Sequence, residues 1–397
     1  MTDQIEIYWR VPMGSDSSNW RNKPKTRGAG ADAPLTLGYI APGLRDGKSD
    51  GLSYIDFLVE EARSAERAGF TGALLPSFPM TEDPFIVSAA LARATTTFRF
   101  MVAVQPGFLN PVHAARISAS LQRLSGGRLV YNVITGGGGP QQTWWGDTTA
   151  HDQRYLRTTE FLDVLKGVWD GGPFDYDGRF YQVRGGGLPA GLAGQPRPDL
   201  YYSGSSESAI ESAVQHADYY LSWLEHPDHL KAKFEQVEAK AATYGRKAKF
   251  AVRAHVIARP TEDEAWEEVR LGWANLDAAK IQRVRREGGR GDSVGAQRQQ
   301  QYQPESLQDW EELIVAPNIW AGIGYLGDFP TVGIVGSYEQ AAERLDDLVR
   351  IGADAFILSG LSHLEEAYRV GTEVLPRFQG RRALDQPAGT AKEVVHV

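Results

Sequence analysis

Two basic side chains on one face of a predicted strand mark the first place where this sequence could do chemistry. The run Lys249–Ile257 reads as a strand, and side chains in a strand alternate between two faces. One face would carry Phe250, Val252, Ala254 and Val256. The other would carry Arg253 and His255, which are costly to enclose unless an anion or an acid meets them. We therefore predict an anion site there, with a buried ion pair to a nearby carboxylate as the structural alternative.

A glycine followed by hydroxyls gives a second candidate. Gly204-Ser205-Ser206 follows the strand-like run Leu200–Ser203 and precedes a predicted helix over Glu207–His216. Backbone N–H groups and hydroxyls at such a turn can hold an anion, so we predict a phosphate cradle. The alternative is that Ser205 only caps the helix.

Three further histidines separate into two groups. His363 follows the predicted strand Ala355–Ser359 after a short turn, which places it at the same end of the fold as His255. His226 and His229 lack the i, i+4 spacing of a helical zinc site, so we interpret them as surface residues and predict no metal. No strand–Gly-x-Gly-x-x-Gly–helix unit is present, and a Rossmann NAD(P) site is not expected.

Short apolar runs alternate with amphipathic stretches along the chain and position these residues. This alternation predicts βα units and a mainly parallel sheet, and the number of strands matches a closed (β/α)8 TIM barrel. The predicted strands are Ile5–Val11, Gly72–Pro76, Arg99–Gln105, Arg128–Ile134, Leu200–Ser203, Tyr219–Trp223, Lys249–Ile257 and Ala355–Ser359. Catalytic groups in such a barrel lie at the carboxyl ends of the strands, where the candidates above fall.

Three segments are longer than the connections that a minimal (β/α)8 barrel requires. We predict one domain over residues 1–380, with insertions at about 16–49, 171–198 and 283–328, and a polar tail at 381–397. Long insertions in barrels tend to be lids or binding loops. The segment Arg283–Gln303 is rich in glycine, arginine and glutamine, so we expect a lid in which Arg290 or Arg298 contacts a bound anion.

Composition excludes several classes of function. The 397 residues carry a formal charge of -8, which opposes general binding to nucleic acid, and contain no cysteine for disulfides, thiolate catalysis or iron–sulfur clusters. Neither a secretory leader nor a run of ~20 apolar residues is recognisable. We expect a cytoplasmic protein that does not associate with membranes.

Several segments, in order, resemble the bacterial luciferase-like flavin monooxygenases, and among them the alkanesulfonate monooxygenases. The matching segments are Gly69–Pro76, Leu124–Arg128, Asn132–Gly136, His151–Tyr155, Gly204–Ser206, Arg253–Val256, Pro317–Gly322 and Ser359–Arg369. The resemblance implies a luciferase-like barrel that uses reduced FMN (FMNH2) from a separate NAD(P)H-dependent flavin reductase, with O2 as co-substrate. It also implies a homodimer or homotetramer.

The resemblance assigns roles residue by residue. Ser205, Ser206 and Tyr155, with His151 beside them, would bind the FMN phosphate, and Asn132 and Thr135 would lie along the flavin. The substrate pocket would contain Trp223, Arg253, His255 and His363, of which the last three would be catalytic. The chain departs from the sulfonate enzymes at Met13-Gly14, Thr81 and Leu361, where that subgroup has histidine, cysteine and tyrosine.

The expected activity is oxidative cleavage of the carbon–sulfur bond of an organosulfonate, which gives sulfite and an aldehyde. The alternatives are a related flavin monooxygenase acting on a sulfone, an alkane or another small molecule, a flavin-binding protein without oxygenase activity, and an oxidoreductase that uses deazaflavin F420. The basic pair favours an anionic substrate over an alkane.

Overall fold

The computed structural model describes residues 5–11, 13, 16–17, 26–27, 54–77, 81–274, 276, 281–282, 284, 291–304, 307, 309–326, 332–361 and 363–380. Most of the first predicted insertion, the whole tail at 381–397, Gly14 and Arg290 lie outside these ranges.

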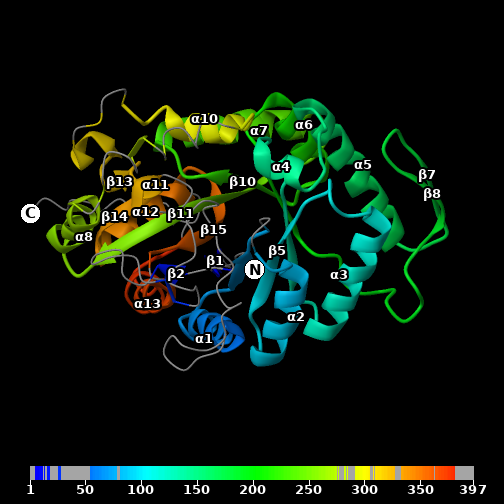
Figure 1. Cartoon of the computed structure of the whole chain (residues 1–397), viewed down its shortest axis with the longest axis horizontal. Coiled ribbons are helices and arrows are strands. Elements are labelled where there is room, and N and C mark those ends of the chain that lie inside the picture. The colour runs from blue at the N-terminus through cyan, green and yellow to red at the C-terminus, as the bar shows by residue number, and fades with distance from the viewer. Residues whose placement is uncertain are drawn as a thin grey trace, which may run out of the picture.

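Eight parallel strands form a closed barrel (Figure 1). Neighbours pair in chain order, and β15 returns to pair with β1, with Trp9 opposite Leu358. The strands are β1 (Glu6–Arg10), β4 (Gly72–Leu75), β5 (Arg99–Val104), β6 (Leu129–Val133), β9 (Leu200–Ser203), β10 (Tyr219–Trp223), β11 (Lys249–Arg259) and β15 (Ala353–Ser359). Each coincides with a predicted strand, so the predicted (β/α)8 TIM barrel is confirmed.

Helices follow the strands and cover the outside of the barrel (Figure 1). They are α1 (Tyr54–Arg67), α2 (Pro84–Ala94), α3 (Pro111–Ser125), α5 (His151–Trp169), α6 (Glu207–His216), α7 (Pro227–Ala242), α8 (Glu262–Ala274), α12 (Tyr338–Arg350) and α13 (His363–Arg369), which continues into a π-helical turn at Val370–Val374. The sequence analysis missed α2. Its start signal is present, because the Asp83 side chain accepts hydrogen bonds from the N–H groups of Phe85 and Ile86.

Alternation divides the strand side chains into an inner and an outer core. The inner core contains Tyr8, Leu74, Met101, Tyr201, Ala251 and Ile357, whereas their chain neighbours pack outward on the helices. A polar network closes the amino-terminal end of the barrel. There the Glu6 carboxylate accepts hydrogen bonds from Tyr8, Tyr201 and Arg99 at 2.7, 2.8 and 2.5 Å. Side chains therefore fill the amino-terminal end of the barrel, and a site can form only at the carboxyl ends of the strands.

The insertions add small elements at the edges of the barrel. Residues 171–198 contain the hairpin β7 (Phe174–Asp177) and β8 (Gln182–Gly186), which projects at the right of Figure 1. Two-residue strands β2 (Asp16–Ser17) and β3 (Thr26–Arg27) pair within the first insertion, and the short α4 (Pro140–Trp144) follows β6.

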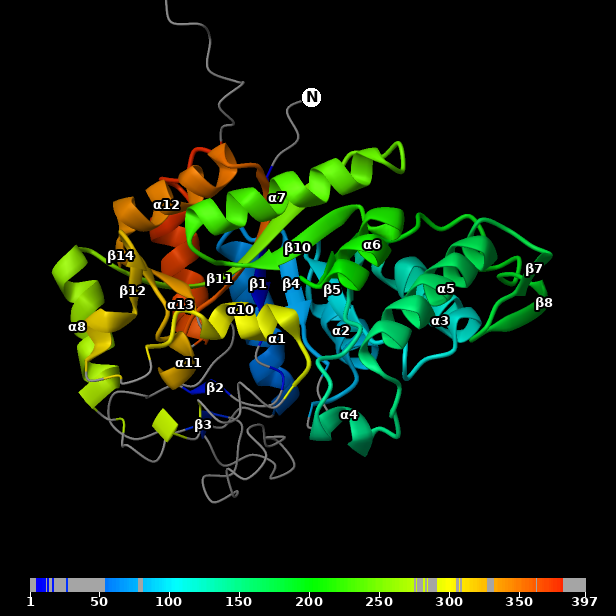
Figure 2. The same cartoon turned by 90° about the horizontal axis from the view of Figure 1, so that it is seen from above.

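The third insertion extends the sheet beyond the barrel. It contains α10 (Val294–Gln300), a 3-10 turn at Trp310–Leu313, β12 (Ile314–Ala316), β13 (Ile319–Trp320) and α11 (Ile323–Leu326). The last five residues of β11 pair with β14 (Gly333–Ser337), which carries β13 and β12 in turn, and the last four of them extend past the end of β15. Figure 2 shows α10 between α11 and α4. None of the helices in the described ranges is long and apolar enough to cross a bilayer.

Candidate functional site

The middle of β11 carries the predicted basic pair on its inner face. Ala251 belongs to the inner core, and Phe250, Val252, Ala254 and Val256 belong to the outer core. Arg253 and His255 therefore point into the barrel, as alternation predicts. The His255 side chain is 1% exposed, and its ring nitrogens lie 3.2 and 3.3 Å from the Ser359 hydroxyl, which sits opposite on β15.

Trp223 and His363 join this group from adjacent elements. Trp223 ends β10 directly opposite Arg253, and both side chains are half-buried. His363 begins α13 just beyond β15; it is buried, and its ring packs edge-on against Trp9 with centroids 6.2 Å apart. The fold thus brings the four predicted substrate residues to the level of the carboxyl ends of β10 and β15.

The sequence analysis missed a third basic side chain at this level. Arg10 is 3% exposed, and its Nη1 lies 3.5 Å from Nε2 of His363. It shares the inner face of β1 with Tyr8, because residues 8 and 10 are two apart on one strand. The strand alternation that predicts an inward-pointing Arg253 makes the same prediction for Arg10.

The predicted phosphate cradle is formed by the turn between β9 and α6. Ser206, and not Ser205, is the helix cap, since its hydroxyl accepts a hydrogen bond from the N–H of Ala209 at 3.2 Å. Gly204 adopts a φ of +151°, and a Cβ there would lie 2.4 Å from Cβ of Ala209 and 3.4 Å from the hydroxyl of Tyr155. Only glycine fits this turn without displacing the first residues of α6.

Tyr155 and His151 approach the cradle from α5. Burial raises the pKa of Tyr155 although a hydrogen bond with Ser206 opposes the shift, so its hydroxyl stays protonated near pH 7. The His151 ring packs edge-on against Tyr155 with centroids 5.0 Å apart. Its Nδ1 lies 2.8 Å from the Asp152 carboxylate, which also accepts a hydrogen bond from Ser208 of α6.

The residues predicted to lie along the flavin occupy the end of β6. Asn132 is buried on the inner face, and its side-chain oxygen has no hydrogen-bond partner among the described residues. Thr135 points outward instead. Its hydroxyl lies 3.0 Å from the hydroxyl of Tyr202, so a flavin contact by Thr135 would have to come from its main chain.

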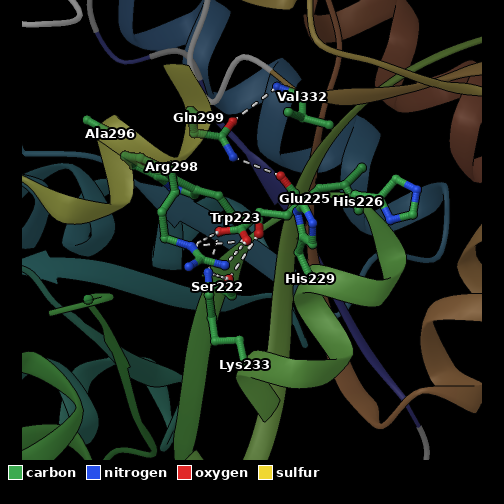
Figure 3. A network of polar contacts seen from close by, with 12 residues as sticks. Ser222, Trp223, Glu225, His226, His229, Lys233, Ala296, Arg298, Gln299 and Val332 are labelled. Carbon is green, nitrogen blue, oxygen red and sulfur yellow. Dashed lines mark hydrogen bonds and ion pairs between the residues drawn. The ribbon is translucent and has the colours of Figure 1, made fainter. Parts of the chain in front are cut away.

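The segment 291–303 is anchored at both ends of α10. The N–H of Asp292 donates to the carbonyl of Gly137 at 3.0 Å, and its carboxylate accepts from Nη2 of Arg154 at 2.6 Å. At the other end the single Nε–H of Arg298 is shared between the two carboxylate oxygens of Glu225, and Nη2 donates to one of them (Figure 3). Arg298, which we expected to contact a ligand, therefore contacts a buried acid.

Glu225 also binds Lys233 of α7, which donates in turn to the Ser222 hydroxyl at 3.0 Å (Figure 3). Burial would raise the pKa of Glu225, but the hydrogen bond from Arg298 and the charge of Lys233 outweigh it, and the pKa is lowered. Burial lowers the pKa of Lys233 to about 8 despite the attraction of Glu225. Sequence alone offered no signal for this cluster, because Glu225 and Arg298 are 73 residues apart.

Among the residues that the structure describes, no group of three or more histidine, aspartate or glutamate side chains is arranged to hold a metal ion.

The chain belongs to the luciferase-like monooxygenase family, whose model matches residues 35–355. Solved structures share its fold. The EDTA monooxygenase from Chelativorans sp. BNC1 is 19% identical with a TM-score of 0.69, over 96% of this chain and 94% of that chain. A long-chain alkane monooxygenase is 20% identical with a TM-score of 0.69, over 98% and 95%. The oxygenating constituent of the Pseudomonas putida 3,6-diketocamphane monooxygenase, solved with FMN, is 17% identical with a TM-score of 0.62, over 85% and 96%.

Proposed function

We propose that this chain is the oxygenating component of a two-component system that cleaves the carbon–sulfur bond of an organosulfonate. The reaction consumes the sulfonate, O2 and FMNH2 and yields an aldehyde, sulfite, FMN and water. One oxygen atom enters the aldehyde and the other leaves as water. The observation that carries the proposal is the pair Arg253 and His255 on the inner face of β11, within a family of monooxygenases.

The side chains around the cradle fit the flavin chemically. A phosphate requires donors, and the turn offers the hydroxyls of Ser205 and Tyr155 together with the amino-terminal N–H groups of α6. A flavin ring edge offers donors and acceptors, and the buried Asn132 oxygen is an acceptor with no hydrogen bond from a described residue. When bound, reduced FMN supplies the two electrons with which O2 is split between product and water.

We assign the substrate head group to the basic side chains. Arg253 presents a planar fork that suits two oxygens of a sulfonate, and it remains protonated at any physiological pH. His255 donates a hydrogen bond to the same head group or exchanges a proton with it, while Ser359 fixes its ring orientation. His363 and Trp223 border the pocket. These roles account for two basic side chains on the inner face of β11, next to an open end of the barrel.

Water must be kept from such a site while it turns over. We propose that the segment 291–303 does this; its contacts to Arg154 through Asp292 and to Glu225 through Arg298 support the proposal. We further propose that the reduced flavin arrives from a transiently bound NAD(P)H-dependent reductase, and that the chain assembles as a homodimer or homotetramer.

The deciding experiment is a coupled assay with a flavin reductase, NADH, FMN and air. We expect sulfite release from at least one sulfonate in a series that runs from methanesulfonate to sugar sulfonates, with none when FMN or O2 is omitted. A matched series of sulfones and alkanes serves as the control. Oxidation of those compounds without sulfite from any sulfonate would move the function to a related monooxygenase. Flavin binding without any turnover would leave a flavin-binding protein.

A further inference from the structure

Arg10 is a buried arginine at the carboxyl end of β1 to which the proposed function gives no role. It is the last residue of the strand and is 3% exposed. Enclosing a guanidinium is unfavourable unless anionic groups or hydrogen-bond acceptors surround it. Arg10 points inward, like Tyr8 two residues before it, and therefore lies on the same side of the barrel wall as Arg253 and His255.

The strand register places Arg10 level with His255. β15 lies between β1 and β11, and Leu358 pairs with the residue before Arg10 on one side and with the residue before His255 on the other. Arg10, Ser359 and His255 are the next residues along the three strands. Because neighbouring strands lie ~4.8 Å apart, the main chains of Arg10 and His255 are separated by ~10 Å.

His363 extends this row of polar side chains. Its Nε2 lies 3.5 Å from Nη1 of Arg10, and the Ser359 hydroxyl lies 3.2 and 3.3 Å from the ring nitrogens of His255. Arg253 lies two residues before His255 on the same face of β11. Four basic side chains therefore line this end of the barrel, with Arg10 on β1 and Arg253 on β11 as its two arginines.

Two buried acids on the adjacent helices bind other partners. Glu61 of α1 is fully buried and accepts a hydrogen bond at 3.2 Å from the indole of Trp9, which belongs to the outer core. Glu366 of α13 pairs with Arg259 at 3.2 Å and also with Arg369, neither of which belongs to the row. A substrate with two anionic groups would meet basic side chains at both ends of the row.

We propose that Arg10 determines substrate specificity by binding a carboxylate, at the opposite end of the substrate from the sulfonate. The substrate class is then a short-chain sulfonate that also carries a carboxylate. This inference rests on the proposed function, because it takes the sulfonate to lie at Arg253 and His255. The planar fork of a guanidinium matches the two oxygens of a carboxylate. Both side chains extend inward from main chains ~10 Å apart, so only a few carbons separate the two anionic groups.

The carboxylate takes no part in the bonds that change. With 3-sulfopropionate, O2 and FMNH2 the products are 3-oxopropanoate, sulfite, FMN and water, and the aldehyde keeps the carboxylate. Arg10 therefore binds a part of the substrate that is the same before, during and after cleavage. Binding of this uniform kind lowers KM and leaves kcat nearly unchanged.

The test compares 3-sulfopropionate with its carboxyl methyl ester, which has the same sulfonate and lacks the second charge. Sulfite release in the coupled assay gives kcat/KM for both compounds. We expect wild type to prefer the acid by at least about 10-fold, and Arg10→Met to lower the acid-to-ester ratio by about 10- to 100-fold, mainly through KM for the acid. Arg10→Lys should keep part of the preference. A general loss of activity in a variant affects both compounds and cancels in the ratio.

The control is an arginine with a structural role at the other end of the barrel. Arg128 precedes β6 and donates hydrogen bonds to the carbonyls of Ala92 and Phe98. Arg128→Met should lower the melting temperature and leave the acid-to-ester ratio at the wild-type value. If Arg10→Met does not fold, the ratios of wild type and Arg10→Lys still decide the question.

The outcomes separate this inference from the proposed function. The carboxylate assignment is overturned if wild type shows no preference for the acid, if folded Arg10→Met keeps that preference, or if other sulfonates are cleaved and 3-sulfopropionate is not. If no sulfonate is cleaved, the proposed function fails, and a thermal shift with the same two compounds decides. Greater protection of wild type by the acid than by the ester, lost in Arg10→Met, would then support the carboxylate site, and equal protection would overturn it.

Discussion

Replacing Gly204 by alanine tests the cradle at the position where the geometry is tightest. The residue has a φ of +151°, which an L side chain rarely adopts, and holding alanine there costs ~1–3 kcal/mol. The new Cβ would also lie 2.4 Å from Cβ of Ala209, a contact that real structures do not tolerate. Overpacking of this kind typically costs a further ~1–3 kcal/mol.

The two penalties can be separated with a second substitution. Ala209→Gly removes the atom that clashes but leaves the backbone strain, so Gly204→Ala/Ala209→Gly should recover the overpacking part. Ala209→Gly alone measures the intrinsic cost of glycine in α6, ~1 kcal/mol. Urea unfolding of the four proteins gives the free energy of unfolding for the complete cycle.

The same cycle has a binding readout. To relieve the clash in Gly204→Ala, the first turn of α6 must move, and Ser205 and Ser206 move with it. We expect FMN affinity to fall by at least about 10-fold in Gly204→Ala and to recover in part in the double variant. If Gly204→Ala unfolds within about 0.5 kcal/mol of wild type and binds FMN equally well, the turn is neither tight nor part of the flavin site.

Three further perturbations address separate parts of the molecule. Arg253→Ala should lower kcat/KM for a sulfonate by an amount that corresponds to ~2–5 kcal/mol of lost transition-state binding. Arg253→Lys should restore only part of it. A folded Arg253→Ala variant with full sulfite release would remove Arg253 from the site. Burial would raise the pKa of Asp147, but hydrogen bonds from Arg157 and Thr149 lower it to about 2. The ionised Asp147 carboxylate therefore stabilises the folded protein by ~1–2 kcal/mol after allowance for solvent. This contribution is present above about pH 4 and is lost as the pH falls towards 2. The unfolding free energies of wild type and Asp147→Asn should therefore converge over that interval. Equal pH profiles would contradict that assignment. Gly138→Ala would place a Cβ 2.6 Å from the Asp292 carboxylate and should speed proteolysis within 291–303. The control is Gly146→Ala, which has a similar φ of +76° and no atom within 4 Å of the new Cβ, and it should not change the rate. Equal proteolysis rates in the two variants would mean that the contact between Gly138 and Asp292 does not hold the segment.

The sequence determined the barrel and the face on which its basic pair lies, because both follow from local periodicity. A strand repeats every two residues, so Ala251, Arg253 and His255 must share a face whatever surrounds them. Start and stop signals for helices are equally local: the Asn110 side chain caps α3 by accepting hydrogen bonds from the next N–H groups, and Gly69 follows α1 with a left-handed φ of +91°.

Tertiary structure decided the contacts between residues that are far apart in the chain. The sequence left open whether Ser205 caps α6 or contacts an anion. In the structure Ser206 caps the helix, and Ser205 lines a cavity together with residues of α6, α7 and α10. The sequence also left open which residue Arg298 contacts, because a flexible charged side chain pairs with whatever acid the fold brings within reach. That acid is Glu225, whose two cations come from different helices, and no pattern in either segment encodes the pairing. Local periodicity sets the direction of a side chain, but only the closed barrel and its docked insertion set its partner.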